Sequence, residues 1–256
     1  KKKLSGPIAL KESAGSAGVV FGTEIESGAD FIVPFEHLQH MLIAGTSGAG
    51  KSIFTHQLLA QLVTAHQVDK MYLVDLKGGV EFNRYSGGKV RVIWRYADVV
   101  AVVDELVALM EARQHEMRER SLQSWPDGRT FLVIDEYAEI QSDLDAASTP
   151  DEKRVAKRLS GNLVRIARRA RALGIVLICA LQKPTVDAMD SALRNNLGCR
   201  ICLRVATRAL ASSMLDDLDD LPADPVKLRT GRYIYYDASR GVRRYVQAHV
   251  APGVSL

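Results

Sequence analysis

Eight consecutive residues follow the pattern G-x-x-x-x-G-K-[ST], the spacing of a loop that wraps around phosphate groups. Glycines let the backbone approach an anion closely, and successive N–H groups can point at its oxygens. A lysine here can reach the β- and γ-phosphates of a nucleoside triphosphate, and the last hydroxyl can bind Mg²⁺. The residues are Gly45, Thr46, Ser47, Gly48, Ala49, Gly50, Lys51 and Ser52. They predict triphosphate binding; a glycine-rich turn without a ligand is the alternative.

A pair of carboxylates, Asp135 and Glu136, ends the apolar run 131–134. An aspartate in this place can hold the shell of a Mg²⁺ ion beside Ser52. The adjacent glutamate can polarise an attacking water as a general base. Acids at a strand end carry little meaning in isolation. Downstream of a phosphate loop they favour hydrolysis of the triphosphate over transfer of its phosphate to a small molecule.

A third polar candidate, Gln182, follows the apolar run 175–181. The carboxyl ends of parallel strands converge on the ligand crevice of such sheets, so this side chain is placed to sense a γ-phosphate. A glutamine that only caps a loop fits the spacing equally well.

The scaffold for these residues is predicted from apolar runs that alternate with helical patterns. Runs that are apolar on both faces are typical of a parallel sheet covered by helices. We expect strands at 41–44, 71–75, 90–94, 131–135, 175–181, 200–205 and 232–236. We expect helices at 52–66, 98–120 and 151–173, the last with a candidate interruption at 160–161 and with Gly174 as its cap. The fold class is therefore α/β.

The domain organisation is predicted to be simple. Residues 1–35 are rich in Gly and Ser and weakly patterned, which indicates an N-terminal arm or small β-appendage. Residues 36–256 form one nucleotide-binding domain. The chain begins with three lysines, without methionine or a signal peptide, which favours a piece of a longer protein. A membrane anchor elsewhere in that protein stays open.

Composition excludes several classes of protein. Hydrophobic residues make up 47% of the 256 residues and charged residues 25%, as in soluble globular chains. No apolar run approaches the roughly 18 residues that span a bilayer. The six histidines have no convincing metal-ligand spacing. The three cysteines lack C-x-x-C spacing, which predicts buried thiols in a reducing compartment.

The net charge is only +4, but its distribution is uneven. Residues 153–171 hold eight basic and no acidic side chains, whereas 216–220 hold four aspartates. The basic segment is either a solvated helix face or a track for a polyanion. Aromatic residues make up only 6% of the chain, and none interrupts the basic segment, so stacking on single-stranded bases is disfavoured.

Together these motifs resemble the motor domain of the FtsK/SpoIIIE DNA translocases, within the wider FtsK–HerA group of P-loop ATPases. The resemblance covers roughly residues 7–237. The phosphate loop alone is common to many ATPases, but the ordered combination is specific. Its carriers are HMLIAGTSGAGKS (40–52), LVDLKG (73–78), VIDEYAE (133–139), ARALGI (170–175), ALQKPTVD (180–187) and RNNLGCRI (194–201).

The resemblance implies a RecA-like fold that assembles into a hexameric ring around double-stranded DNA, with ATP and Mg²⁺ bound between subunits. The family's phosphate, metal and base positions are matched by Lys51, Ser52, Asp135 and Glu136, and its polar sensor by Gln182. Arg200 is similar to the arginine finger that is supplied to the neighbouring subunit. A surface arginine at a strand edge is the alternative for Arg200, and Arg204 is the reserve candidate for the finger.

The expected function is ATP-driven translocation of double-stranded DNA in chromosome or plasmid transfer. Residues 217–222 depart from the family's usual glycine pair, so the family's DNA contacts are not carried over to that segment. The short stretch before Phe131 and the lack of a winged-helix module in the given sequence favour conjugative coupling ATPases. The alternative is a type VII secretion-like ATPase that engages protein substrates. A small-molecule kinase is disfavoured by the acid pair and Gln182. We expect a cytoplasmic location, at the inner face of the membrane if a longer chain carries an anchor.

Overall fold

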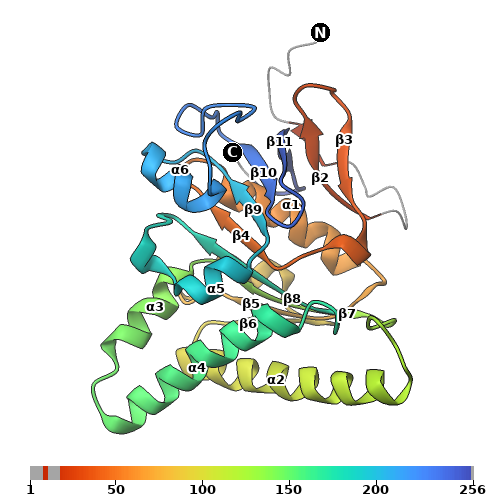
Figure 1. The fold of residues 1–256 in the computed structure, drawn as a ribbon, viewed down its shortest axis with the longest axis vertical. Coiled ribbons are helices and arrows are strands. Elements are labelled where there is room, and N and C mark those ends of the chain that lie inside the picture. The colour runs from red at the N-terminus through yellow and green to blue at the C-terminus, as the bar shows by residue number, and fades with distance from the viewer. Residues whose placement is uncertain (1–7, 11–17, 255–256) are drawn as a thin grey trace.

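Continuous aliphatic runs build the centre of a ten-stranded sheet in the computed structural model, which describes residues 8–10 and 18–254. The strand order is β3-β2-β11-β10-β9-β4-β8-β7-β5-β6 (Figure 1). Six neighbouring strands of it are parallel: β4 (Met41–Ala44), β5 (Val68–Val74), β6 (Val90–Ile93), β7 (Arg129–Ile134), β8 (Ile175–Leu181) and β9 (Cys199–Cys202). The predicted α/β fold with a mainly parallel sheet is confirmed.

The remaining strands of this sheet run antiparallel to their neighbours. They are β2 (Val19–Glu24), β3 (Asp30–Val33), β10 (Arg232–Asp237) and β11 (Val242–Gln247). A separate parallel pair joins β1 (Ile8–Ala9) to β12 (His249–Val250). Strands β2 and β3 fall within the predicted arm, and through β11 they extend the main sheet. Residues 1–7 and 11–17 of that arm lie outside the described residues, and the division at residue 35 stays a prediction.

Helices cover both faces of the sheet. Helix α1 (Lys51–Thr64) packs on one face with the aromatic side chains of β2 and β10. The other face is covered by α2 (Tyr96–Glu119), α3 (Tyr137–Ala146), α4 (Pro150–Arg169), α5 (Ser191–Asn196) and α6 (Arg208–Leu215). Short 3₁₀ turns lie at Phe35–His37, Asn83–Tyr85 and Val186–Ala188. The strands beneath these helices are buried on both sides, which is why their sequences read as unbroken apolar runs.

The basic helix α4 is unbroken, but it ends four residues before the predicted boundary at 173, so Gly174 is not its cap as predicted. Thr149 and Glu152 form a capping box, and Pro150 occupies the first turn, so the helix start is strongly fixed. The predicted interruption at 160–161 is wrong, because α4 continues through Gly161 without a break. A Cβ at this position would meet no atom within 4 Å, so the glycine faces open space. The helix ends at Arg169, and Gly174 adopts a left-handed φ of +70° in the turn before β8.

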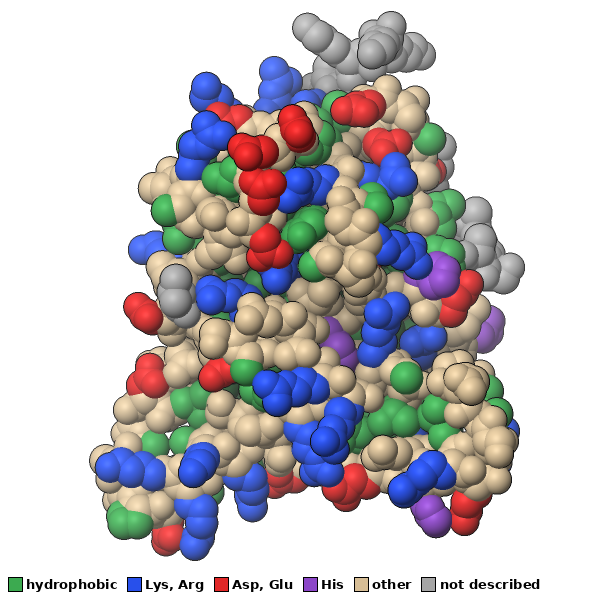
Figure 2. Space-filling view, viewed as in Figure 1, with side chains coloured by type: hydrophobic (Ala, Val, Ile, Leu, Met, Phe, Trp, Pro, Cys, Tyr) green, Lys and Arg blue, Asp and Glu red, His purple; other side chains and the backbone are tan. Residues whose placement is uncertain are grey.

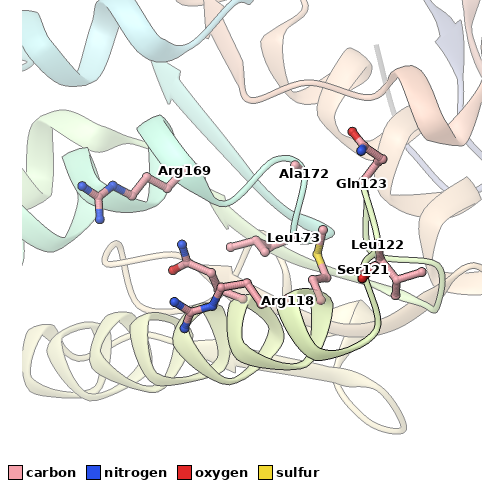
Figure 3. Close-up of a pocket in the computed structure, with 9 residues that line it drawn as sticks. Arg118, Ser121, Leu122, Gln123, Arg169, Ala172 and Leu173 are labelled. Carbon is pink, nitrogen blue, oxygen red and sulfur yellow. The ribbon is translucent and has the colours of Figure 1, made fainter.

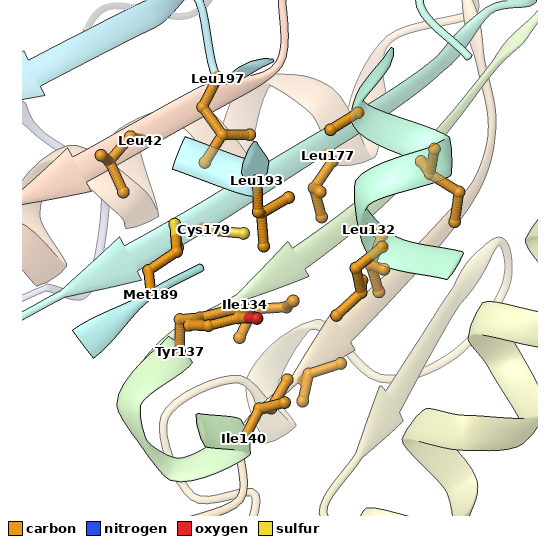
Figure 4. Packing of buried hydrophobic residues seen from close by; sticks show 14 of the residues in the cluster. Leu42, Leu132, Ile134, Tyr137, Ile140, Leu177, Cys179, Met189, Leu193 and Leu197 are labelled. Atoms are coloured by element: carbon orange, nitrogen blue, oxygen red, sulfur yellow. The ribbon is translucent and has the colours of Figure 1, made fainter. Parts of the chain in front are cut away.

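A tight apolar cluster lies between β7, β8 and the helices above them (Figure 4). Tyr137 is fully buried there beside Ile134, Cys179 and Met189. Burial of its ring is favourable, but its hydroxyl has no hydrogen-bond partner among the described residues, which offsets part of that gain. Because Tyr137 is the first residue of α3, this packing fixes the end of β7 and the two residues that connect it to the helix.

No helix of the described residues is long and apolar enough to cross a membrane.

Candidate functional site

The phosphate loop, residues 45–52, connects the end of β4 to the start of α1. Its first N–H groups are used inside the protein: Gly45 donates to the carbonyl of Leu181 at 3.2 Å, and Thr46 to that of Arg204 at 2.9 Å. The next groups are not. Among the described residues, no acceptor is bonded to the N–H groups of Ser47, Gly48 and Gly50. Neighbouring N–H groups of this kind, next to a helix N-terminus, form an anion-binding site.

The outer side of the loop rests on the segment before β10. The Thr230 hydroxyl donates to the carbonyl of Gly48 at 3.0 Å, and the N–H of Gly231 donates to that of Ala49 at 2.9 Å. Gly50 has a φ of +99°, and a Cβ on it would lie 2.5 Å from the Gly231 nitrogen. Only glycine fits this position.

Lys51 and Asp135 meet across the mouth of the sheet. The Lys51 ammonium donates to the Asp135 carboxylate at 2.9 Å and to the Asp135 backbone carbonyl at 2.8 Å. Both residues are buried. The ammonium thus joins the first turn of α1 to the end of β7, two elements that the sequence separates widely.

Glu136 lies directly behind this contact. Its Oε1 accepts the backbone N–H of Gln182 at 3.2 Å, whereas its buried Oε2 has no hydrogen-bond partner among the described residues. Burial raises the pKa of Glu136; Lys51, the Gln182 N–H and Lys77 oppose that rise, and Asp135 adds to it. A carboxylate in such surroundings can take up a proton more readily than an exposed one.

A cavity of about 500 Å³ brings most of the predicted residues together. It is lined by Gly45, Thr46, Ser47, Gly48, Gly50, Lys51, Ser52, Asp135 and Gln182. Ala49 is fully buried beneath the loop, and Glu136 lies just behind the wall. The cavity size suits a nucleotide-sized ligand.

The oxygen atoms that the protein offers at this cavity are suited to a Mg²⁺ ion that takes most of its ligands from a bound nucleotide and water. Ser52 and Asp135 contribute a hydroxyl and a carboxylate, the hard oxygen atoms that Mg²⁺ prefers. Among the described residues, no three His, Cys, Asp or Glu side chains gather as a metal site. A Mg²⁺ bound here would therefore complete its shell with phosphate oxygens and water, as is usual for this ion.

Four lining residues were given no role at the site by the sequence argument: Ile53, Lys77, Glu81 and Thr230. Lys77 and Glu81 belong to the loop after β5, which Asp75 organises. The Asp75 carboxylate accepts the backbone N–H groups of Lys77 at 3.0 Å and Glu81 at 2.9 Å. An acid that ends a strand next to β7 was a signal for this loop, because β5 and β7 end at the same edge of the sheet.

Arg200 lies away from the cavity. It is buried in β9, 4% exposed, and its guanidinium donates to the Met214 carbonyl at 3.1 Å and to the Asp216 carboxylate at 2.5 Å. The alternative of a surface arginine at a strand edge is therefore wrong. The finger role stays a prediction, and it requires Arg200 to leave Asp216. The reserve candidate, Arg204, is half-buried, and its carbonyl holds Thr46.

The three cysteines are free and buried, as the sequence predicts. The basic residues of α4 follow the helix across the lower half of the surface in Figure 2. Some are paired within the chain: Arg158 with Asp104 at 3.1 Å, and Arg165 with Glu111 at 2.7 Å. These pairs support the solvated-face alternative for that stretch.

A second cavity, of about 610 Å³, lies where the carboxyl ends of α2 and α4 approach each other (Figure 3). Arg118 and Arg169 flank it, and Leu173, which precedes β8, lies in its wall. It is therefore at the opposite edge of the sheet from the phosphate loop. Arginines in the last turn of a helix stabilise its negative dipole end, which accounts for both side chains.

Comparison with known proteins places the chain in a family. A model of the FtsK/SpoIIIE family matches residues 6–146, which include the phosphate loop, Asp135 and Glu136. The chain belongs to the FtsK/SpoIIIE family. The DNA translocase FtsK of Staphylococcus aureus (strain Mu50) is 29% identical over 197 residues, which cover 71% of this chain and 25% of that protein. The chain thus spans about a quarter of the length of such relatives.

Solved structures agree with this assignment. The pCW3 conjugation coupling protein TcpA, solved as a monomer with ATPγS, superimposes with a TM-score of 0.81 at 25% identity, covering 95% of this chain and 70% of that one. The cytoplasmic domain of the type VII secretion ATPase EccC from Thermomonospora curvata gives a TM-score of 0.69 at 22% identity, covering 97% and 30%. The second likeness concerns the fold alone.

Proposed function

We propose that this chain is an ATP-hydrolysing motor domain that drives double-stranded DNA through a ring of its own copies. The observation that carries the proposal is the junction of Lys51, Asp135 and Glu136 at one cavity, in a chain of the FtsK/SpoIIIE family. The names of the relatives, a DNA translocase and a conjugation coupling protein, support chromosome or plasmid transfer as the setting.

In this proposal the side chains divide the chemistry. The N–H groups of Ser47, Gly48 and Gly50 hold the phosphates, and Lys51 turns from Asp135 to the β- and γ-phosphates. Ser52 and Asp135 would hold Mg²⁺, which supplies charge neutralisation at the phosphates. Glu136 accepts the proton of the attacking water. Gln182, which lines the cavity while its N–H holds Glu136, senses the γ-phosphate.

The ring is part of the proposal because the described residues that line the cavity include two lysines, Lys51 and Lys77, but no arginine. An arginine supplied by a neighbouring subunit stabilises the transition-state charge and can raise turnover about 10³–10⁵-fold. Arg200 is the proposed finger. The membrane-facing side of the cytoplasm is the proposed location if a longer chain carries an anchor.

The proposed role of Arg200 as an arginine finger is tested by measuring ATP hydrolysis in Arg200→Ala, with Asp216→Asn as the matched control. Arg200→Ala removes buried hydrogen bonds, so some loss of thermal stability is expected in either case. If Arg200 acts on the neighbour's ATP, turnover per folded molecule collapses in Arg200→Ala while ATP binding holds, and Asp216→Asn stays active because it frees the arginine. If Arg200 only anchors Asp216 and Met214, both variants lose stability and neither changes turnover per folded molecule. The second pattern removes Arg200 from the finger role.

The motor claim is tested by measuring ATP hydrolysis with and without duplex DNA at low salt. We expect duplex to stimulate turnover, and the stimulation to fall as salt rises, because grip on phosphates is electrostatic. Particle mass with ATP and duplex present checks the ring, with six copies expected. Hydrolysis that ignores duplex at every salt concentration would contradict the proposal.

A second candidate is a type VII secretion-like ATPase that engages protein substrates. The fold likeness to EccC favours retaining it. The two candidates differ in their affinity for a polyanion. Salt-sensitive retention of the chain on immobilised duplex supports the DNA motor, whereas no retention at low salt, together with peptide-stimulated hydrolysis, supports the secretion ATPase.

A further inference from the structure

A buried histidine on α1 holds a carboxylate in the wall of the nucleotide cavity. The carboxylate belongs to Glu81, which lines the cavity from the loop after β5. His56 Nε2 lies 3.0 Å from Glu81 Oε1, and His56 Nδ1 lies 2.8 Å from the Tyr85 hydroxyl. With its proton on Nε2, the neutral ring donates to Glu81 and accepts from Tyr85, so one tautomer makes both bonds. Tyr85 thus orients the ring, and the ring orients the carboxylate.

The backbone around Glu81 is also fixed. The N–H of Glu81 donates to the Asp75 carboxylate at 2.9 Å, and Asp75 is buried. The next residue, Phe82, is fully buried and packs edge-on against the ring of His56 at 6.3 Å between centroids. The side chain of Glu81 keeps 37% exposure. An anchored loop therefore presents a partly exposed carboxylate to the cavity.

Helix geometry places this carboxylate near Ser52, the candidate hydroxyl ligand for Mg²⁺. His56 follows Ser52 by four residues in α1, so the two side chains share one helix face, about 5–6 Å apart at their Cβ atoms. Ser52 and Glu81 line the same cavity. No three His, Cys, Asp or Glu side chains of the described residues gather as a direct metal site. The spacing therefore suits a contact between Glu81 and the ion through water.

A carboxylate in this position is unfavourable unless a cation faces it, because a negative charge repels phosphates at short range. Among the described residues, the hydrogen bond and ion pair of the Glu81 carboxylate are made with His56 alone. Burial lowers the pKa of His56, with Glu81 opposing, so the ring is neutral near pH 7 and does not cancel the charge. Mg²⁺ that binds phosphates usually keeps several water molecules. A hydrated Mg²⁺ thus supplies both the missing charge and hydrogen-bond donors.

We propose that Glu81 positions Mg²⁺ in the nucleotide site: its carboxylate, held by His56 and Tyr85, accepts hydrogen bonds from water bound to the ion. This inference rests on the proposed ATPase function. Groups that act on a metal through its ligands typically change its affinity about 10–100-fold. Glu81 should therefore strengthen the binding of ATP with Mg²⁺ and weaken the binding of ATP without it.

The test compares the affinity of a fluorescent, non-hydrolysable ATP analogue in Mg²⁺ and in a chelator. In Glu81→Gln the ratio of the two affinities should fall about tenfold, because the amide neither attracts the hydrated ion nor repels bare phosphates. The amide oxygen can still accept from His56, so the local structure is kept. Paramagnetic resonance of Mn²⁺, added with the analogue, gives a direct readout, in which Glu81→Gln should bind Mn²⁺ more weakly.

Two further variants separate position from general charge. Glu139→Gln removes an acid on α3 that pairs with Lys77 outside the cavity lining, and should leave the ratio unchanged. His56→Phe keeps a buried aromatic ring but releases Glu81, and should lower the ratio by less than Glu81→Gln does. Binding of the analogue in chelator reports that each variant is folded.

The outcomes distinguish this inference from the proposed function. An unchanged ratio in Glu81→Gln or in His56→Phe overturns the inference alone, as does an equal fall in Glu139→Gln. A wild-type chain that binds no analogue, or that hydrolyses no ATP in any assembly, overturns the proposed function instead.

Discussion

The parallel and antiparallel parts of the same sheet contribute differently to the site. Strands β4, β5, β7 and β8 are parallel, and at their carboxyl ends they deliver the phosphate loop, Asp75, Asp135 and Gln182. Strands β2, β3, β10 and β11 are antiparallel, and of these only the segment before β10 reaches the cavity, through Thr230. The candidate catalytic residues lie together because the carboxyl ends of parallel strands share one edge of the sheet. An antiparallel neighbour has its amino end at that edge instead.

The antiparallel strands instead provide a packing surface for helix α1. Phe54, in the first turn of α1, packs edge-on against Tyr233 of β10 at 5.0 Å and Phe21 of β2 at 5.7 Å between ring centroids. Such aromatic pairs add about 0.5–1.5 kcal/mol beyond their burial. Because α1 begins with Lys51, this packing fixes the helix whose start carries the lysine. We therefore call the parallel strands and their loops the reactive part, because they supply the candidate catalytic residues. We call the antiparallel strands the bracing part, because they support α1.

The largest effect should come from the reactive part. Glu136→Gln removes the proposed base but keeps an acceptor for the Gln182 N–H, so hydrolysis should fall about 10²–10⁴-fold while ATP binding is retained. Steady-state ATPase rates and nucleotide binding check this. Glu139→Gln, a neighbouring acid on α3, is the control and should stay active. Equal losses in both variants would assign the effect to local charge rather than to a base.

The junction between the two parts is tested by Gly50→Ala. The φ of +99° and the approach of Gly231 to 2.5 Å require the loop or the segment before β10 to shift, and the free energy of unfolding should drop by about 3 kcal/mol or more. Gly48→Ala has a similar φ of +69° but open space, so about 1 kcal/mol is expected. Denaturant unfolding measures both. Equal costs would mean that the contact with Gly231 is unimportant.

A pH effect should arise at the start of β4, at the edge of the sheet opposite the phosphate loop. His40 is buried just before β4, and its Nδ1 accepts the N–H of Leu177, so burial lowers its pKa from 6.5 to about 4. Between these values the unfolded chain binds one more proton than the folded chain, so stability is full above pH 6.5 and falls as the pH drops. The loss reaches up to about 3 kcal/mol near pH 4.

The measurement is unfolding by denaturant across that pH range for wild type, His40→Asn and His115→Asn. His40→Asn should lack this part of the slope. His115, exposed on α2, serves as the matched control and should keep it. A slope shared by all three chains would point to other titrating groups.

The smallest effect is expected in the bracing part. The Tyr233 hydroxyl is fully buried and donates to the Phe21 carbonyl at 2.5 Å, so Tyr233→Phe should cost about 1–2 kcal/mol and leave nucleotide affinity unchanged. Tyr245→Phe, whose half-buried hydroxyl receives only a 3.4 Å bond from Arg232, should cost less. Loss of nucleotide binding in Tyr233→Phe would break the division between reacting and bracing parts.

This division also marks what could be predicted from the sequence. Strands β4 and β8 were predicted to the residue, because strands buried on both faces have continuous apolar runs. Gly45, Gly50, Lys51 and Ser52 of the phosphate loop line one cavity together with Asp135 and Gln182, while their roles stay predictions. Strands β2 and β3 were predicted only as an arm or small β-appendage without bounds, and β11 was not predicted. Strands β3 and β11 are partly exposed and so lack a continuous apolar run.

Long-range partners explain the remaining differences. The guanidinium of Arg200 is paired with Asp216, which lies in a separate loop. A contact of this kind cannot be predicted from the spacing of residues along the sequence. Lys77 belongs to the LVDLKG motif, but no role was predicted for it, and its place in the cavity follows from the turn that Asp75 builds. The helix break expected at Gly161 failed because glycine on a solvated face costs only about 1 kcal/mol, which the packing of α4 outweighs.

The buried thiols give the unmodified chain a built-in reporter. Cys179 in β8 and Cys199 and Cys202 in β9 lie on the two strands that flank β4, and burial raises the pKa of all three, that of Cys202 to about 12. Alkylating reagents attack the thiolate, so the folded chain should resist them. Cys199 faces the α1 layer, and the other two face the opposite layer. The rate of alkylation at each cysteine, followed by peptide mass, would therefore time the transient opening of each layer around the strand that carries the phosphate loop.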